Sequence, residues 1–462
     1  MKTALLDRFS TLRNLTLDRV LVAILYVMVI LLPLTYYGTI EVGFTVKLYE
    51  VVGALGFALL VVDRIRKREL RWRKTPLDIP LLGFWLVAAL SLTQAVDLER
   101  GIAWWLWLSF YIFGFYYLIV NVVHEERHIH GLLKTYLVVA AVISAFALTQ
   151  FFLDWAGLPS LIRPAYSKFG SLAVPRPNAT FLEPLYFGFY LLPPSVFLSV
   201  SFLSKKSVFF KVKTEASLLL LYLTAMAATL SRGSIIALIG SLVILVALYL
   251  GFYILNKRKF DHTFTPLWPR FVVVLIAVIP IFFGITWIGL GLERVFHSTD
   301  ADILKKREEA KAEESRLSLN DPRYKEWGNA LKMFKNHPVL GVGLGNFGPT
   351  KTGVSRGISG AGKGFAIVNN EPLEVATETG SLGLLAYLGF NVVFVWQMVL
   401  GIWKSIKTRL YSQVPLFAGF LLSFLAMSAQ FLTLSTIQIG SFWFILGMGA
   451  AWVALFERRI SS

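Results

Sequence analysis

Amide and carboxylate side chains gather in the stretch IVNNEPLEVATETG, at residues 367–380 of an otherwise apolar chain. Asn369 and Asn370 stand near its start, and Glu371 follows them directly. Glu374 falls about one helical turn after Glu371, so a helix would place both carboxylates on nearly one face. A glutamate partly buried beside apolar helices can have its pKa raised until it takes a proton from a hydroxyl. We therefore predict a proton-accepting site here, with Glu371 as the candidate general base.

Two arginines form a second group that could do chemistry. Arg176 lies with Glu183 in RPNATFLEPLYFG, and Arg232 lies in TLSRGS between two apolar runs. Guanidinium groups stay charged and bind phosphate oxygens through paired hydrogen bonds. Two of them on one membrane face would therefore suit a diphosphate. Other interpretations stay open, because Arg232 could simply reach for the polar interface from a helix end and Arg176 could be a loop residue without a ligand.

The remaining residue types restrict the alternatives. The chain contains no cysteine, which excludes disulfides, thiolate nucleophiles and cysteine-based metal sites. Of its six histidines, His297 and His337 fall on the predicted outer side, and His337 precedes Pro338 at a predicted helix end. Such a histidine more often caps a helix than catalyses. A reaction could also need little base catalysis, because diphosphate is a good leaving group that arginines stabilise.

The composition places these groups in a membrane protein. Of 462 residues, 56% are apolar and 16% are charged, whereas soluble chains contain roughly a quarter charged residues. A membrane-spanning helix needs about 20 mostly apolar residues. Repeated apolar runs predict an all-α polytopic protein with about twelve transmembrane helices, at residues 20–37, 44–62, 79–95, 103–123, 132–153, 185–203, 216–230, 234–252, 270–291, 379–403, 413–428 and 436–456.

The distribution of charge predicts how these helices are oriented. Cytoplasmic loops of membrane proteins collect Lys and Arg, and segments 63–78, 204–215 and 404–412 are strongly basic. The short loops 38–43 and 429–435 contain neither residue type. We therefore predict cytoplasmic termini and outward-facing motifs, and we attribute the net charge of +17 to loops instead of to nucleic-acid binding. The first apolar run is too long for a cleavable signal peptide.

Outer segments divide the chain into three parts. Residues 1–291 hold the first nine predicted helices and an outer loop at 154–184, which is rich in proline and aromatic residues. Residues 292–378 form a helical extracytoplasmic insertion, and residues 379–462 hold the last three predicted helices.

The insertion itself is predicted to contain helices and a loop. Residues 303–317 have the charge pairing of a solvated helix, and residues 352–364 have the glycine and serine content of a loop. Between them, residues 320–338 predict a helix on the membrane surface or across the bundle mouth. Its predicted apolar face comes from residues spaced three or four apart, Tyr324, Trp327, Leu331 and Phe334.

Four stretches resemble the characteristic stretches of one enzyme family. They are RPNATFLEPLYFGFYL (176–191), SRGSIIALI (231–239), HPVLGVGLGNF (337–347) and NNEPLEVATETGSLGLL (369–385). In type and order they resemble the O-antigen ligase and O-antigen polymerase superfamily, over roughly residues 155–390. The resemblance implies a GT-C-like architecture.

The same resemblance implies a metal-independent, inverting glycosyltransferase that needs no cofactor. Such enzymes move a glycan from an undecaprenyl diphosphate carrier to an acceptor at the periplasmic face of the bacterial inner membrane. The acceptor is lipid A-core for ligases and another carrier-linked glycan for polymerases. The family's arginines are held to grip the diphosphate, which by motif position implies that role for Arg176 and Arg232.

The sequence departs from the family at a pair that is usually His-Asn. Here the pair is Asn369-Asn370, and asparagine cannot take up a proton at neutral pH, whereas the family's histidine is assigned as general base. Asn369 is therefore predicted to orient the sugar beside the candidate base Glu371. Further residues are predicted to contact the glycan or the acceptor: Asn370, Glu374, Glu183, Tyr324 and Trp327.

Two other classes of protein compete with this interpretation. A twelve-helix transporter or flippase for a lipid-linked or anionic solute would explain the arginines equally well. It would, however, place polar or broken-helix features at mid-membrane, and the predicted spans contain few. A structural scaffold would give the motifs no role. Between ligase and polymerase, the missing histidine slightly favours a polymerase.

Overall fold

The computed structural model describes most of the chain. The described residues are 2–35, 39–41, 45–69, 72–155, 158, 165–169, 172–204, 207–255, 322–355, 367–435 and 437–461. Several predictions therefore fall outside the described residues: the span 270–291, the helix 303–317, His297 and most of the loop 352–364.

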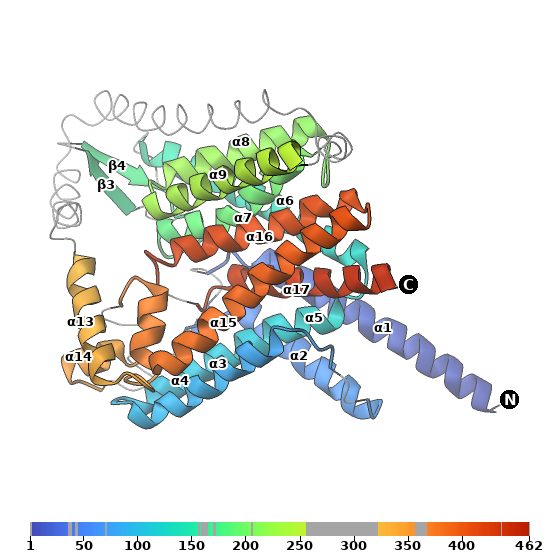
Figure 1. Ribbon diagram of the computed structural model, residues 1–462, viewed down its shortest axis with the longest axis horizontal. Helices are drawn as coiled ribbons and strands as arrows, with labels where there is room; N and C mark the ends of the chain where they lie inside the picture. The colour runs from blue at the N-terminus through green and yellow to red at the C-terminus, as the bar shows by residue number, and fades with distance from the viewer. Residues whose placement is uncertain are drawn as a thin grey trace.

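The described chain is almost entirely helical (Figure 1). Its helices in chain order are α1 (Lys2–Leu31), α2 (Leu48–Arg66), α3 (Asp78–Ser91), η1 (Leu92–Gln94), α4 (Leu98–Ser109), η2 (Phe110–Tyr117), α5 (Leu118–Val122), α6 (Glu126–Trp155), α7 (Pro184–Leu203), α8 (Val212–Ala228), α9 (Arg232–Leu255), α13 (Pro322–Asn336), α14 (Phe347–Thr352), α15 (Glu371–Lys407), η5 (Tyr411–Gln413), α16 (Val414–Gln430) and α17 (Gly440–Ser461).

Two short antiparallel hairpins depart from the predicted all-α chain. β1 (Thr39–Glu41) pairs with β2 (Thr45–Lys47), and β3 (Ala165–Phe169) pairs with β4 (Leu172–Arg176). In the second hairpin Ala165 lies opposite Arg176, so the strand pairing fixes the backbone of the arginine at the end of β4. The helical class is confirmed for the bundle, and the hairpins lie in its connections.

Six described helices are long and apolar enough to cross a membrane, which supports a polytopic membrane protein. They span Leu98–Val122, Glu126–Asp154, Pro184–Leu203, Glu371–Lys407, Tyr411–Gln430 and Gly440–Ser461. Shorter apolar helices occupy Asp78–Gln94 and Arg232–Leu248. Every predicted span within the described residues overlaps a helix, but the count of twelve and the GT-C-like architecture stay predictions.

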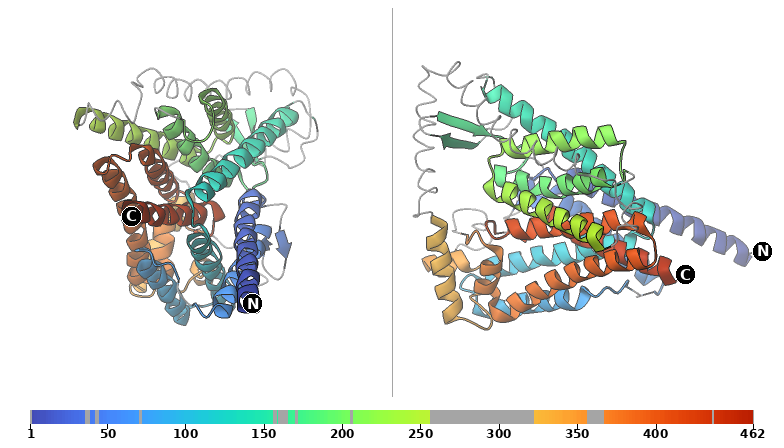
Figure 2. Two further views of the ribbon diagram at one scale, coloured as in Figure 1. Left: turned by 90° about the vertical axis from the view of Figure 1, so that its right-hand side faces the viewer. Right: turned by 45° about the horizontal axis from the view of Figure 1, so that its top comes forward.

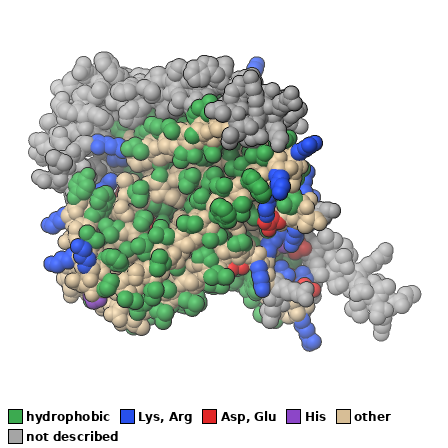
Figure 3. All heavy atoms as spheres, in the orientation of Figure 1, with side chains coloured by type: hydrophobic (Ala, Val, Ile, Leu, Met, Phe, Trp, Pro, Cys, Tyr) green, Lys and Arg blue, Asp and Glu red, His purple; other side chains and the backbone are tan. Residues whose placement is uncertain are grey.

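The long helices run side by side, and both termini lie at one end of the bundle (Figures 1 and 2). We call this the terminal end, and we call the opposite end, which carries β3, β4, α13 and α14, the motif end. Hydrophobic side chains cover the surface between the two ends on the face that Figure 3 shows. In the core, α16 packs against α7 and α9, while α15 packs against α3. The elements that end near one another at the motif end position the candidate site.

Candidate functional site

Arg176 and Arg232 are brought together by a short turn. β4 ends at Arg176, whose Nε donates a hydrogen bond of 2.8 Å to the carbonyl oxygen of Thr229. Thr229 belongs to the turn between α8 and α9, and α9 begins at Arg232. The Arg232 side chain is exposed, and that of Arg176 is partly exposed. The Arg176 side chain therefore contacts the turn that leads into Arg232, although the two motifs lie far apart in the sequence.

The turn itself is tightly packed. Leu230 adopts a left-handed conformation with φ of 50°, and Ser231 Oγ lies 2.8 Å from Ser234 Oγ. A Cβ atom added to Gly188 of α7 would lie 2.3 Å from Ser234 Oγ, and one added to Gly233 would lie 2.6 Å from Thr433 Oγ1. Only glycine permits these close approaches. The backbone that presents Arg232 is therefore wedged between α7 and the end of α16.

A segment that the sequence analysis missed joins the two motif groups. Residues 430–435, QFLTLS, begin with the last residue of α16. On one side, Gln430 Nε2 donates to the carbonyl oxygen of Leu185 at 3.1 Å, near the arginines. On the other side, the carbonyl oxygen of Phe431 accepts the Glu371 N–H at 2.8 Å. The absence of Lys and Arg from the predicted outer loop 429–435 was a signal that could have pointed to this segment.

Asn370 begins the helix that carries the glutamates. Its side-chain oxygen accepts the Leu373 N–H at 3.1 Å, as asparagine at a helix N-terminus commonly does. Its own N–H donates to Ser435 Oγ at 2.8 Å, and its Nδ2 donates to the carbonyl oxygen of Leu432 at 3.3 Å. Asn370 is thus committed to positioning α15 on the 430–435 segment.

Asn369 precedes this cap in a left-handed conformation, with φ of 57°. Asparagine adopts this conformation more readily than most residues, and histidine shares that tendency. Its side chain is partly exposed. The backbone therefore explains why an asparagine is tolerated here, and the amide is available to a ligand at the motif end.

Three carboxylates share one face of α15, as the sequence predicted for Glu371 and Glu374. The exposed fractions are 4% for Glu371, 8% for Glu374 and 5% for Glu378. Together with Trp104 and Gln438 they line a cavity of about 20 Å³, which fits about one water molecule. The carboxylates thus face inward toward α3 and α4, in contrast to the exposed Arg232.

Glu374 and Glu378 also hold backbone segments in place. Glu374 Oε2 accepts the Val368 N–H at 2.9 Å. Glu378 accepts the N–H groups of Gly345 at 2.7 Å and Phe347 at 3.1 Å. The stretch 337–347 therefore wraps around the first part of α15, and Glu378 supports this loop.

The wrapping requires a break in α15. Gly380 has φ of 69° and ψ of −168°, and a Cβ atom there would lie 2.1 Å from the carbonyl oxygen of Val339. A residue with a side chain would meet both a strained backbone and a clash. The break separates the short segment that carries the glutamates from the long apolar segment that follows.

Arg100 and Asp97 form another part of the site that sequence reasoning missed. Arg100 is 5% exposed, its Nε donates to the carbonyl oxygen of Gly345 at 2.7 Å, and its guanidinium lies 5.3 Å from the Trp104 ring centre. The Asp97 N–H donates to Asn346 Oδ1 at 2.7 Å. These contacts dock the 337–347 stretch on α4. No local pattern around residues 97–100 signals them, because their partners are distant in sequence.

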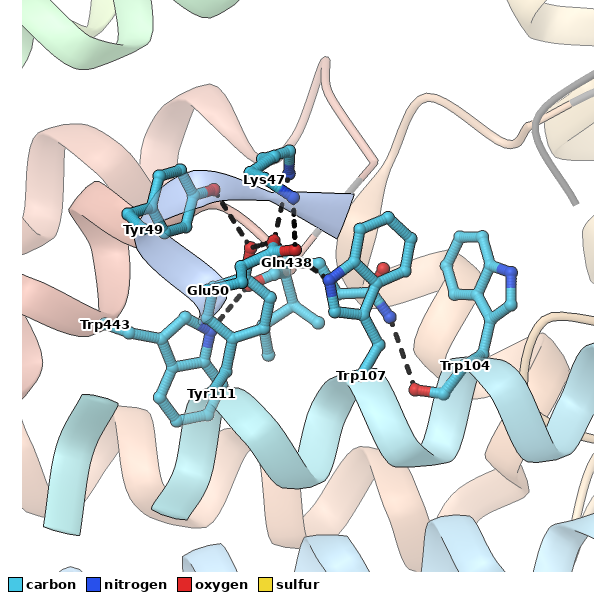
Figure 4. Close-up of polar contacts among 9 residues, drawn as sticks. Lys47, Tyr49, Glu50, Trp104, Trp107, Tyr111, Gln438 and Trp443 are labelled. Carbon is cyan, nitrogen blue, oxygen red and sulfur yellow. Dashed lines mark hydrogen bonds and ion pairs between the residues drawn. The ribbon is translucent and has the colours of Figure 1, made fainter. Parts of the chain in front are cut away.

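Another buried carboxylate, Glu50, belongs to a polar cluster close to the cavity residue Gln438 (Figure 4). Its Oε1 accepts hydrogen bonds from Tyr111 Oη at 2.7 Å and Trp107 Nε1 at 2.9 Å, and it lies 3.5 Å from Lys47 Nζ. Gln438 lies beside this cluster, and its Nε2 reaches the carbonyl oxygen of Trp104 at 3.5 Å. Because Glu50 pairs with Lys47 and accepts a hydrogen bond from Trp107, it links β2 to α4.

The predicted face of α13 is partly wrong. Trp327 does face inward, and its Nε1 donates to the carbonyl oxygen of Val368 at 3.0 Å. Tyr324 and Leu331, however, are 57% and 46% exposed. A spacing of seven residues places these two on one side of the helix, whereas Ala330 lies on the packed side with Trp327. The apolar residues therefore lie on two faces of α13. Among the described residues, the face that contains Trp327 is the one that packs against other apolar side chains.

The other predicted residues lie around the same end. Glu183 is exposed and directly precedes α7. His337 is exposed, and its N–H continues the end of α13 by donating to the carbonyl oxygen of Met333 at 2.9 Å. Within the described ranges, His, Asp and Glu form no group of three that could hold a metal ion.

Comparison with known proteins identifies the region that contains three of the four motifs. Residues 217–388 match the model of a family described as O-antigen ligase. The match includes 231–239, 337–347 and 369–385, and it begins after the stretch 176–191. No curated protein gives a significant match to the chain. The resemblance inferred from the motifs is thus confirmed over residues 217–388, where the chain is similar to the O-antigen ligase family.

Proposed function

We propose that this protein moves a glycan from an undecaprenyl diphosphate carrier to an acceptor at the outer face of a bacterial cytoplasmic membrane. The family match supports glycan transfer of the O-antigen ligase or polymerase type, and the apolar helices support a membrane location.

One observation supports the site most directly. The 430–435 segment contacts the neighbourhood of the arginines through Gln430 and Leu185, and it contacts the carboxylate helix through Phe431 and Glu371. An anion-binding group and a proton-accepting group thus flank one short segment. Glycan transfer from a diphosphate needs both groups at one place.

The proposed reaction is a single displacement. The acceptor hydroxyl attacks the anomeric carbon on the face opposite the diphosphate, and the bond between that carbon and the diphosphate oxygen breaks. Arg176 and Arg232 stabilise the negative charge on the departing diphosphate. The hydroxyl proton moves to Glu371, which acts as general base. Attack from the opposite face inverts the anomeric configuration, and no metal or cofactor takes part.

The remaining site residues would hold the two sugars. Asn369 offers a partly exposed amide to a hydroxyl, and Asn370 fixes the start of α15. Glu374 lines the cavity beside Glu371, while the exposed Glu183 stands at the start of α7. Tyr324 offers an exposed ring to a sugar, and Trp327 contributes by holding α13 in place.

The proposed orientation puts both termini in the cytoplasm. The terminal end is strongly basic, as cytoplasmic surfaces of membrane proteins are. Burial, together with the charge of Arg73, lowers the pKa of His124 there. The pKa of Arg73 is itself lowered to about 10 by burial and by Arg458. The motif end, with the arginines and glutamates, would then face the periplasm.

An assay with purified protein tests the proposal. The protein is incubated with a carrier-linked oligosaccharide, with and without lipid A-core. A ladder of repeats identifies a polymerase, which the amide at Asn369 slightly favours, and a single product on lipid A-core identifies a ligase. Unchanged activity after metal chelation is expected. Absence of any product would contradict the proposal and favour a transporter or flippase.

A further inference from the structure

The exposed side of α13 carries lysines to which the proposed reaction gives no role. Three lysines lie there, Lys325, Lys332 and Lys335, and all three side chains are exposed. Tyr324 and Leu331 are exposed beside them. We call these five residues the α13 lysine face.

Helical geometry makes this face a continuous stripe. Lys325 and Lys332 are seven residues apart, which places them on one side of the helix at a separation of about 10 Å along its axis. Lys335 follows on the same side within one further turn. Within the residues that the structure describes, these lysines take part in no salt bridge, whereas Lys351 nearby pairs with Glu326 at 2.5 Å. The stripe therefore presents uncompensated positive charge.

The opposite side of α13 fixes the helix over the candidate site. Trp327, Ala330 and Met333 pack with Phe347 and Val368 in a small apolar cluster. In Figures 1 and 2, α13 crosses the end of the long helices instead of running along their apolar sides. The lysine face therefore points away from the bundle, where lipid tails do not reach.

On the face drawn in Figure 3, the basic side chains at the motif end outweigh the acidic ones. The carboxylates of Asp97, Glu371, Glu374 and Glu378 are buried, and on the face drawn in Figure 3 blue side chains at this end have no red neighbours. Glu99 and Glu183 are exposed at other helix starts.

We propose that the α13 lysine face binds the acidic sugars of an anionic glycan. Ammonium groups donate charge-assisted hydrogen bonds to carboxylates or phosphates, and the exposed ring of Tyr324 gives a sugar ring an apolar surface. The Trp327 bond to Val368, which itself bonds to Glu374, places α13 beside the proposed reaction site, with the lysine face on its outer side. A glycan held there would extend from the reacting sugar across α13. This inference rests on the proposed function and assigns its substrate an acidic class.

A transfer assay with matched donors tests the assignment. The donors are undecaprenyl diphosphate oligosaccharides that differ only in carrying glucuronate or glucose. The wild-type protein is expected to use the acidic donor about tenfold better at low ionic strength. This preference should shrink at high salt, where screening shortens the range of charge interactions to about 3 Å. Equal use of both donors at every ionic strength would overturn the assignment while leaving the proposed function intact.

Substitutions locate the effect. The triple variant Lys325→Glu, Lys332→Glu, Lys335→Glu should lose the acidic preference and keep wild-type transfer of the neutral donor. Lys211→Glu with Lys213→Glu, two exposed lysines at the start of α8, is the matched control and should behave as wild type. A parallel loss with both donors in the triple variant, or an equal loss in the control, would contradict the assignment.

Direct binding separates this inference from the proposed function. Calorimetry with the free glucuronate oligosaccharide should show binding to wild-type protein and none to the triple variant. If the protein binds this ligand but transfers no glycan, the proposed function fails and the lysine face stands. If these lysines instead bind vesicles of anionic phospholipid and ignore the oligosaccharide, the occupant is a membrane surface and the inference is overturned.

Discussion

The turn between α8 and α9, which leads into Arg232, is called the arginine turn here, and the first part of α15, which carries Glu371, is called the glutamate helix. They lie on two sides of the 430–435 segment and differ in the exposure of their charged side chains. Arg232 is exposed at the start of α9, whereas Glu371 is 4% exposed and faces a cavity between α15 and α4. A guanidinium group keeps its charge in either setting. A carboxylate changes its affinity for protons when it loses water.

This difference in exposure suits two separate chemical roles, one toward the leaving group and one toward the nucleophile. A diphosphate carried by a lipid arrives fully charged, and an exposed cation can meet it without a large desolvation cost. A base must take a proton that water would otherwise compete for, and a cavity too small for bulk water favours that step. The arginines would therefore act on the leaving group and the glutamates on the nucleophile.

Removal of an arginine should have the largest effect. Arg232→Ala or Arg176→Ala is expected to reduce the transfer rate about 10²- to 10³-fold, because the charge of the departing diphosphate loses a partner. Arg232→Lys should recover only part of this loss, since an ammonium group cannot make the paired bonds of a guanidinium. Rates with a carrier-linked donor measure the effect. Arg66→Ala is the control, because Arg66 is an exposed arginine at the end of α2. Full activity in both Arg176→Ala and Arg232→Ala would contradict the role of these arginines in binding the diphosphate.

Neutralising the buried carboxylate should cost less. Glu371→Gln keeps the shape of the side chain and removes its ability to accept a proton, so the rate should fall about 100-fold. Donor binding, measured separately, should be retained because the arginines are unchanged. Glu99→Gln, an exposed glutamate at the start of α4, controls for loss of negative charge at this end. An unaltered rate in Glu371→Gln would assign the proton to another acceptor or to solvent.

The two regions also differ in how far the sequence predicts them. The helices that frame both regions follow from long apolar runs, and the α8–α9 turn follows from the polar residues between two such runs. Glu371 and Glu374 share a face because helical spacing dictates it. These features depend on neighbours in the sequence.

Contacts between distant residues could not be predicted in the same way. The bond from Arg100 to Gly345 joins residues 245 positions apart, and the docking of Asn370 on Ser435 joins residues 65 positions apart. On α13, the spacing marked two apolar faces, and the choice of the Trp327 face depended on Phe347 and Val368. The missed residues are those whose role comes from tertiary packing.

The loop that joins the glutamates to α4 gives a test of stability. Glu378→Ala removes an acceptor that holds the N–H groups of Gly345 and Phe347, and it should lower the free energy of unfolding by about 2 to 3 kcal/mol. Gly380→Ala should also destabilise the fold, because its φ of 69° and its contact with Val339 leave no room for a methyl group. Thermal unfolding in detergent measures both.

Glu457→Ala provides the matched control for Glu378→Ala. Glu457 pairs with Lys404 at the terminal end with 56% of its side chain exposed, and its loss should change stability by less than about 1 kcal/mol. If Glu378→Ala matched this control, its bonds to the 337–347 stretch would contribute little to the fold. The glutamate helix would then differ from the arginine turn only in the burial of its charged side chains, and not in how strongly these side chains hold the neighbouring backbone.

The smallest expected effect comes from giving the amide position a proton acceptor. Asn369→His should fold normally, since histidine tolerates the left-handed backbone at this partly exposed position, and it should change the wild-type rate less than about threefold because Glu371 already takes the proton. In the Glu371→Gln background, the same substitution should raise the rate about tenfold. That gain should appear as pH rises through about 6.5, where imidazole becomes neutral and can accept a proton. Asn336→His is the control, because Asn336 is exposed at the end of α13, and it should give no gain in rate. An equal gain in this control, or no gain from Asn369→His, would show that the proton acceptor does not act at the start of α15.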